Sequence, residues 1–444
     1  MNLHQAFTIF NEYNRLSNVN DDDDDDTDDD ESQDDDQDRL LPPTDLNQDI
    51  FDLMVMLGSI LSSMQAKKKA KSKRKVKLDV RFPRRALPSP ASSPWVHIYA
   101  SNCNKAMICF TGLNYAAFNY LSVMFEELYN KYTPYSRSGF IVLKKRINRY
   151  RRPRSLDSRG CLALVLAHLR SRGSLNWLCM LFGTTYSVTQ LFLRFGRRLL
   201  LLVLKNIPAT KVTMPSEEDI REYQVIVAER FPTLDGVWFV MDGLRLSLQK
   251  PNVGEIQSKF YTGWKKDHTV NNVFVFCPGG TIIAAAINAP GCVHDSNLAF
   301  MGRVYDKLHD QYELYGGKGV VDQAFASALF PFLIKSGKEE DIPTDAPPEI
   351  VQQNREAIYL RQSAEWGMRA IQSSFPRLYD KLPYEEFGER RLLLRSVVHL
   401  YNFRTIFVGR NQIQTVFVPY MEQFNEQMTA TWIQDMNVEE ENIQ

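Results

Sequence analysis

The second half of the chain alternates between short apolar runs and stretches in which apolar residues have helical spacing. Runs rich in β-branched and aromatic residues predict strands at 236–242, 256–263, 271–277, 281–288 and 319–322. Apolar residues three and four positions apart predict helices at 295–308, 324–335, 350–374 and 386–407. Antiparallel strands followed by alternating helix and strand form a mixed sheet with helices packed on it. We therefore expect an α/β domain over residues 211–422, followed by a loose C-terminal tail, 423–444.

Residues 93–210 are dominated by helical spacing. Apolar side chains over 105–133 fit an amphipathic helix. Asp157 is placed to cap the next helix and Gly173 to stop it, and two further helices are separated by a turn at Gly183. Two short helices, a glycine turn and a longer helix with arginines make a helix-turn-helix pattern. We expect an all-α, helix-turn-helix-like domain that either docks on DNA or supports the sheet with its arginines in solvent.

The formal net charge of zero conceals two opposed regions. The sequence has 53 Lys and Arg and 53 Asp and Glu, and 14 of the acids lie in residues 21–38, so the rest of the chain carries +14. A basic body attracts polyanions such as nucleic acid. The acidic run cannot fold alone because its like charges repel; it either shields the basic surface or is a solvated segment. Residues 1–92 are expected to be a disordered N-terminal region.

Basic residues gather in clusters that suggest both a destination and a partner. Residues 67–77 hold eight cations in eleven positions, which suits a nuclear import signal, an arm that lies on phosphates or a solvated linker; we favour the import signal. The import residues are Lys67, Lys68, Lys69, Lys71, Lys73, Arg74, Lys75 and Lys77. A second cluster and the last helix of the 93–210 region are expected to contact DNA phosphates. These residues are Lys144, Lys145, Arg146, Arg149, Arg151, Arg152, Arg194, Arg197 and Arg198. We expect a nuclear protein whose partner is DNA.

Three carboxylates stand out in the α/β domain. Asp242 and Asp322 each end an apolar strand run, and Glu365 lies in a segment free of Pro and Gly, 350–366. Taken singly, Asp242 suits an Asp-Gly turn, Asp322 a helix N-cap and Glu365 an exposed helix charge. Taken together, they form a set of hard oxygen ligands for Mg²⁺ or Mn²⁺. Because two such ions can activate water and stabilise a leaving phosphodiester oxygen, we predict all three as catalytic residues and metal ligands.

A further cluster, Gly291-Cys292-Val293-His294-Asp295-Ser296, precedes the helix predicted at 295–308. Asp295 or Ser296 is placed to cap that helix. Alternatively, His294 and Asp295 line the same pocket as the three carboxylates, in a supporting role rather than as primary metal ligands. The sequence leaves both interpretations open.

Cysteine usage and hydropathy bear on the compartment. The six cysteines show no CxxC spacing, which predicts reduced thiols and no structural zinc site, as in an intracellular protein. No apolar stretch reaches 18 residues, and the N-terminus lacks the order of a signal peptide. We expect a soluble protein that is not secreted and has no membrane partner.

The order of the predicted elements is that of the ribonuclease H-like fold, and the chain resembles a known family. It is similar to PIF/Harbinger-type transposases, in the DDE superfamily endonuclease group that also includes the IS5-like enzymes. The similarity covers roughly residues 95–420 and is strongest from 236 to 410. The matching stretches are Met241-Asp242-Gly243, Pro290-Gly291-Cys292-Val293-His294-Asp295-Ser296, Val321-Asp322-Gln323-Ala324-Phe325, Ala364-Glu365-Trp366-Gly367-Met368-Arg369 and Tyr401-Asn402-Phe403-Arg404.

The resemblance implies a ribonuclease H-like core in which Asp242, Asp322 and Glu365 hold two divalent ions. The implied reactions are strand cleavage at transposon ends and strand transfer into target DNA, by in-line attack of water or a DNA 3′-hydroxyl. Family members often work with a separate Myb-like DNA-binding protein, so we expect such a partner, and a homo-oligomer on DNA. Leu244 and Trp366 depart from the residues that many relatives have beside their acids, but neither departure removes a carboxylate.

Two competing hypotheses remain. A domesticated relative would keep the fold and bind DNA or chromatin without cutting it. A metal-dependent ribonuclease on the same fold would act on RNA. The intact set of three acids favours an enzyme over the non-cutting relative, and competition between DNA and RNA substrates would separate the two nucleases.

Overall fold

Within the described part of the chain, strand β3 (Val237–Ser247) is the centre of a six-stranded mixed sheet. β5 (Asp267–Phe276) pairs with β3 antiparallel, and β7 (Lys318–Val321) pairs with it in parallel. β6 (Ile282–Pro290) continues the sheet beyond β5, and β8 (Leu333–Lys335) continues it beyond β7. The order across the sheet is β6-β5-β3-β7-β8, and the short strand β4 (Tyr261–Thr262) also pairs with β5. The predicted α/β class with a mixed sheet is thus confirmed.

This computed structural model describes residues 81–135, 142–143, 153–252, 254–263, 265–325, 329–337, 342, 346–384, 386–409, 411–414 and 417. Every described residue belongs to Ser72–Gln444, the second of the two units into which the chain divides. The predictions made for the acidic run, the import signal and the tail after residue 422 lie outside these residues. The proposed domain boundary near residue 210 stays a prediction.

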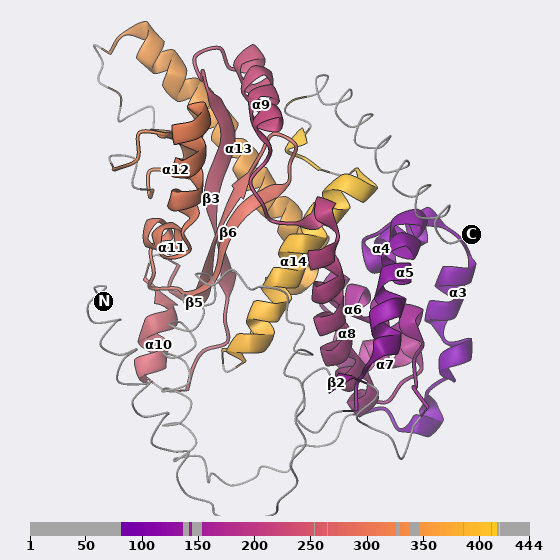
Figure 1. Ribbon diagram of the computed structural model, residues 1–444. Helices are drawn as coiled ribbons and strands as arrows, with labels where there is room; N and C mark the ends of the chain where they lie inside the picture. The colour runs from indigo at the N-terminus through magenta and orange to yellow at the C-terminus, as the bar shows by residue number, and fades with distance from the viewer. Residues whose placement is uncertain are drawn as a thin grey trace, which may run out of the picture. The chain divides into compact units, whose positions relative to one another are not determined.

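Helices cover both sides of the sheet (Figure 1). α11 (Asp295–Met301) and α12 (Val304–Tyr315) lie on one side, where α11 packs against β5 and β6. α13 (Pro348–Ser374) and α14 (Phe387–Val408) lie on the other side, and α13 packs across β3 and β7. α9 (Glu217–Arg230) also packs against β3. This double cover explains why β3 begins as a continuous apolar run rather than an alternating one.

The packing of β3 against β7 depends on a glycine. Phe239 is the register partner of Gly319, and a methyl group at Gly319 would overlap the Phe239 ring. We expect Gly319→Ala to lower the free energy of unfolding by about 1–3 kcal/mol through overpacking. Gly388→Ala is the matched control, because a methyl group there would meet nothing within 4 Å. Urea denaturation of both variants checks the prediction, and equal midpoints would contradict it.

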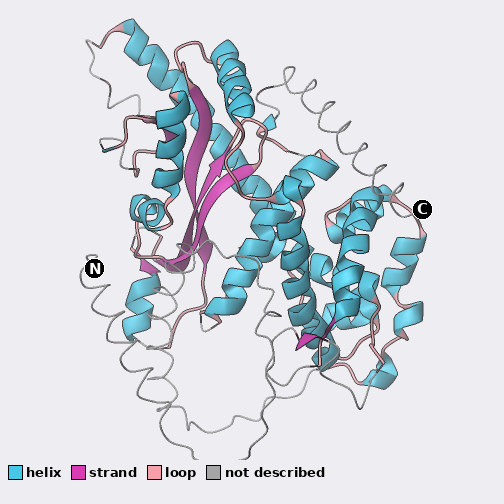
Figure 2. Cartoon of the chain, in the orientation of Figure 1, coloured by secondary structure: helices cyan, strands magenta, loops and turns pink. Residues whose placement is uncertain are grey.

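The described residues before the sheet are mostly helical (Figure 2). Its helices are α3 (Pro94–Ala100), α4 (Asn104–Thr111), α5 (Tyr115–Lys131), α6 (Ser158–Arg170), α7 (Leu175–Phe182) and α8 (Tyr186–Asn206). A small hairpin of β1 (Tyr132–Thr133) and β2 (Val142–Leu143) follows α5. The single helix predicted over 105–133 is two helices, because Gly112 adopts a left-handed conformation with φ 85° and ends α4.

Two predicted helix ends in this segment are confirmed. The Asp157 side chain caps α6 by accepting a hydrogen bond of 2.7 Å from the Gly160 N–H. Gly183, with φ 62°, ends α7 in the left-handed conformation that glycine adopts without steric cost. The turn at Gly183 leads directly into α8.

The helical segment packs against α14, one of the helices that cover the sheet. α8 lies along α14, and Arg404 of α14 donates a hydrogen bond of 2.8 Å to the Gly112 carbonyl. Arg170 of α6 donates to the Ser374 carbonyl at the end of α13, at 2.9 Å. The end of α13 is therefore held by a residue of the helical segment.

Two predicted elements of the sheet region have a different secondary structure from the one expected. The strand predicted at 256–263 is mainly helix α10 (Gly254–Phe260), followed by the short strand β4 (Tyr261–Thr262) beside β5. Ile256 and Phe260 are four residues apart and both buried, so a helix buries them as well as a strand would. The helix predicted at 324–335 is wrong for the described residues of that range, which contain no α-helix and end in β8, where Leu333–Lys335 pairs with β7.

The helix predicted at 295–308 is interrupted. Gly302 ends α11 and Arg303, with φ 53°, starts α12 in a new direction. The chain comes so close to β6 here that a methyl group at Gly302 would overlap Ala286. Among the described helices, none is both long and apolar enough to cross a membrane.

Candidate active site

The register of β3 and β7 brings two of the predicted carboxylates together. Met241 of β3 is paired with Val321, the last residue of β7. Asp242 and Asp322 are the next residues on two parallel neighbours, so they lie side by side where β7 leaves the sheet. The prediction that Asp242 ends its strand is wrong, because β3 continues to Ser247 alongside β5.

Glu365 comes to this place from α13. The helix packs across β3 and β7, and its residues Ala364 and Met368 are buried against them. The Glu365 side chain is 40% exposed and accepts a hydrogen bond of 3.0 Å from Arg361, one turn earlier. The helix predicted for Glu365 is therefore present, and its packed face fixes where the carboxylate emerges.

The electrostatics of Asp242 connect these groups. The pKa of Asp242 is raised from 3.8 to about 6; burial is the largest cause, and the neighbouring carboxylates of Asp322 and Glu365 contribute to the rise. The Gly243 N–H, which donates to Asp242 at 2.7 Å, and the Arg361 guanidinium both lower it. Asp242 is thus a desolvated carboxylate that shares its surroundings with two other acids.

The donor set fits a hard divalent cation by its chemistry. All three groups are carboxylates, and the mutual repulsion that raises the pKa of Asp242 is what a bound cation would relieve. Within the described ranges, no group of three or more His, Cys, Asp or Glu side chains is arranged closely enough to hold a metal ion. The acids therefore supply suitable oxygen donors without already forming one ligand shell.

Asp295 lies beside the carboxylate pair but on the other face of β3. It is buried in the first turn of α11, and a methyl group at Gly243 would come within 2.6 Å of its Oδ2. Its Oδ2 accepts a hydrogen bond of 3.1 Å from Arg245. Because alternate residues of a strand face opposite ways, Gly243 and Arg245 share the face opposite Asp242.

The surroundings of Asp295 leave part of its carboxylate unpaired. Burial raises its pKa, Arg245 lowers it, and Asp322 raises it again. Oδ1 is buried and has no hydrogen-bond partner among the residues that the structure describes. The exposed His294 is the N-cap residue of α11 and makes no side-chain cap, so neither Asp295 nor Ser296 is that cap. A supporting role for His294 and Asp295 stays a prediction.

The comparison with known protein families bears on this arrangement. Residues 241–402 match the family model described as DDE superfamily endonuclease. The match begins one residue before Asp242, contains Asp322 and Glu365, and ends at Asn402 in α14. No curated protein matches the chain, and no solved structure does. The carboxylates brought together by β3, β7 and α13 thus all belong to a DDE endonuclease-like segment.

Two arginines of the DDE endonuclease-like segment were missed by the sequence analysis. Arg361 precedes Glu365 by four residues on a helix, a spacing that by itself predicts an ion pair. Arg245 pairs with Asp295, which is fifty residues away in the chain. Local spacing therefore contained a signal for Arg361 and none for Arg245.

The predicted DNA contacts are only partly described. Lys144, Lys145, Arg146, Arg149, Arg151 and Arg152 have side chains outside the described residues. Arg194 is exposed on α8. Arg198 donates to Glu389 of α14 at 2.9 Å, and Arg197 lies 3.9 Å from the same carboxylate. Arg197 and Arg198 are thus also contacts between α8 and α14, and their binding to DNA stays a prediction.

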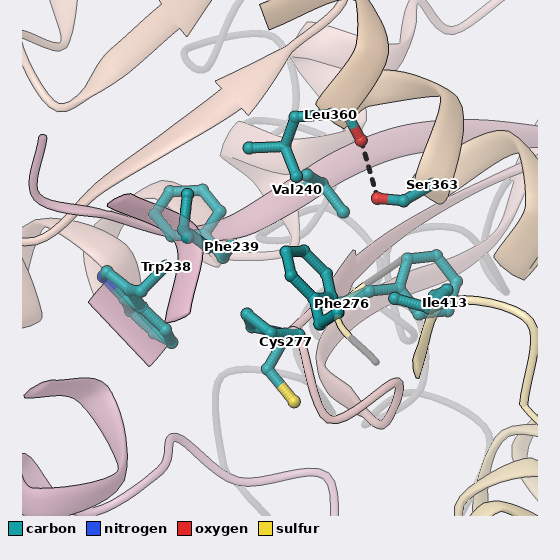
Figure 3. A pocket seen from close by; sticks show the side chains of 11 residues that line it. Trp238, Phe239, Val240, Phe276, Cys277, Leu360, Ser363 and Ile413 are labelled. Carbon is teal, nitrogen blue, oxygen red and sulfur yellow. Dashed lines mark hydrogen bonds between the residues drawn. The ribbon is translucent and has the colours of Figure 1, made fainter. Parts of the chain in front are cut away.

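A small apolar cavity lies in the core between β3, β5 and α13 (Figure 3). Trp238, Phe239, Phe276 and Leu360 are among its lining residues, and its volume is about 10 Å³, enough for roughly one water molecule. Ser363 lines it as well and satisfies its own hydroxyl by donating to the Leu360 carbonyl at 2.6 Å. This cavity is a packing defect between α13 and the sheet rather than a place for substrate.

Proposed function

We propose that this protein is a divalent-metal-dependent DNA endonuclease of the PIF/Harbinger transposase type, which cuts and joins phosphodiester bonds at transposon ends. The observation that carries the proposal is the pairing of Met241 with Val321, which sets Asp242 beside Asp322 within the family match. The strand order β6-β5-β3-β7-β8, in which β5 and β6 are antiparallel neighbours and β7 and β8 run parallel to β3, supports a ribonuclease H-like fold for this segment.

The roles of the residues follow from their chemistry. Asp242, Asp322 and Glu365 would hold the cations, with two Mg²⁺ or Mn²⁺ ions expected. When bound, these ions supply the Lewis acid that activates water and stabilises the leaving oxygen. Burial of Asp242 keeps water from competing at its carboxylate, and the packed face of α13 limits the positions open to Glu365. The chain thus contributes orientation and oriented negative charge, which is what phosphoryl transfer requires of it.

The remaining assignments are part of the same proposal. The exposed Arg194 and the basic residues near position 150 would bind DNA backbone phosphates, with α7 and α8 acting as a helix-turn-helix. The basic run 67–77 would direct the protein to the nucleus. A Myb-like DNA-binding protein and further copies of this chain would be its partners on DNA. These assignments follow from sequence and resemblance.

Incubation of the full chain with supercoiled plasmid DNA tests the central proposal. We expect nicking in Mn²⁺ and none in EDTA. For Glu365→Gln we expect a nicking rate lower by on the order of 100-fold, because a metal-site carboxylate is lost. Glu349→Gln is the matched control, since Glu349 is an exposed glutamate of the same helix. Equal nicking by wild type and Glu365→Gln would refute the assignment of Glu365. DNA binding by the wild type without nicking would favour the domesticated, non-cutting alternative, and faster cleavage of a competing RNA would favour a ribonuclease.

A further inference from the structure

Arg361 lies on α13 one helical turn before Glu365. Its Nη1 donates a hydrogen bond of 3.0 Å to Glu365 Oε1. The arginine is the more buried member of the pair, with 23% of its side chain exposed against 40% for Glu365. It therefore differs from an ordinary exposed ion pair along a helix, in which both groups are free to move in water.

The guanidinium of Arg361 is only partly used. Its Nε is buried and has no hydrogen-bond partner among the described residues. A guanidinium presents five N–H donors in a planar fork that matches a carboxylate or a phosphate. A buried donor left without a partner is costly, so this group stands to gain from an additional oxygen acceptor.

The position of Arg361 is also electrostatically special. α13 packs across β3. Arg361 lowers the pKa of Asp242, whereas Asp322 and Glu365 raise it. The guanidinium is thus a positive charge paired with Glu365 and near enough to Asp242 to lower the pKa of its carboxyl. A divalent cation bound to those carboxylates would repel it, so the binding of the cation and the Arg361–Glu365 pair oppose each other.

We propose that Arg361 is an internal counter-ion, which holds Glu365 in the metal-free protein, releases it when a divalent cation binds, and then binds a phosphate of the DNA. This role rests on the proposed function, because it assigns a regulatory exchange to the same site. It would keep three carboxylates from repelling one another before the cation arrives. It would also add a phosphate contact only after the cation has bound.

Calorimetric titration of the full chain with Mn²⁺ in the absence of DNA tests the first half of the exchange. Arg361→Gln is expected to bind Mn²⁺ about threefold to tenfold more tightly than the wild type, since a competing charge pair of modest strength is removed. Arg361→Lys keeps the charge and should stay near the wild-type affinity. Arg369→Gln is the matched control, because Arg369 lies four residues after Glu365 on the same helix but is exposed.

The second half is tested by measuring the salt dependence of binding to a short DNA duplex. Ca²⁺ serves as the cation and EDTA as the comparison. Loss of one phosphate contact lowers the slope of log K against log salt by about one. We expect that decrease for Arg361→Gln in Ca²⁺ but not in EDTA, and no decrease for Arg369→Gln in either.

The outcomes separate this proposal from the proposed function. If wild type binds Mn²⁺ and nicks DNA while Arg361→Gln binds Mn²⁺ with equal or weaker affinity, the counter-ion role is refuted and the nuclease stands. If the wild type binds no Mn²⁺, both proposals fall. Circular dichroism and thermal unfolding of each variant establish that the comparison is made between folded proteins.

Discussion

The Asp242→Asn variant is expected to lose DNA cleavage and yet be more stable than the wild type at neutral pH. Asparagine keeps the size of the side chain and an oxygen that can accept the Gly243 N–H. It removes the negative charge through which Asp242 would bind a cation, so we expect nicking in Mn²⁺ to fall by on the order of 1,000-fold. The plasmid assay in Mn²⁺ measures this effect, and equal rates for both proteins would refute a catalytic role for Asp242.

The gain in stability follows from the raised pKa of Asp242. The unfolded chain has a pKa of 3.8 at this position and the folded protein about 6, so the folded state holds the proton more tightly. Folding is therefore penalised once the carboxylate is ionised, and wild-type stability falls as pH rises from about 4 to about 6. Asparagine has no such penalty. At pH 7.5 in EDTA, Asp242→Asn should be more stable by about 2–3 kcal/mol, and the gain should vanish below pH 4.

Urea denaturation at pH 4 and pH 7.5, both in EDTA, checks the stability prediction. Glu349→Gln, at an exposed position of α13, should show no comparable gain at the higher pH. A wild-type protein as stable as Asp242→Asn at both pH values would mean that the Asp242 carboxylate is not desolvated. Loss of activity with increased stability is the pattern of a residue selected for chemistry rather than folding.

The Arg390→Met variant is expected to lose about 2–4 kcal/mol of folding stability, because it strands buried acceptors. Arg390 of α14 is only 2% exposed, and burial lowers its pKa to about 10. Its guanidinium donates to Asn288 Oδ1 at 2.5 Å and to the Pro383 carbonyl at 2.6 Å. Methionine fills similar space but donates no hydrogen bond, so both oxygens would be left without this donor inside the protein.

The effect of Arg390 should reach β3 through side-chain amides. The Asn288 N–H donates to Asn272 Oδ1 at 2.9 Å, and Asn272 Nδ2 donates to the Leu244 carbonyl of β3 at 3.0 Å. Thermal unfolding measures the loss, and Arg369→Met, at an exposed position, should stay within about 0.5 kcal/mol of wild type. Equal unfolding temperatures for the two variants would show that the hydrogen bonds of Arg390 contribute little.

How far the sequence predicts the site depends on whether a feature is local. The apolar run that forms β3 and the helix around Glu365 are local patterns, and the structure contains both. β8 is different, because it is a strand only through its hydrogen bonds to β7. The three residues Leu333–Lys335 are too few to show a periodicity that would predict this pairing. Spacing of two and spacing of four coincide at Ile256 and Phe260, so the pattern there could not separate strand from helix.

The same reasoning applies to the site residues. Asp242 and Asp322 could be chosen because each follows an apolar run, although the true end of β3 lies five residues beyond Asp242. The pairing of Arg245 with Asp295 depends on how α11 folds back over β5 and β6. Arg390 contacts Asn288, a residue of β6 whose own backbone has the unusual φ of 67°. Such contacts arise from the tertiary fold, and a single sequence does not record them.

The bond from Arg170 to the end of α13, together with that from Arg404 to Gly112, has a consequence for how this protein can be divided. A fragment starting at residue 211 would lose the helices that cover α14, and the Ser374 carbonyl would lose its arginine. It would therefore expose apolar surface and loosen the helix that carries Glu365. Exchange of the helical segment for an unrelated one would therefore also require a new packing face on α14.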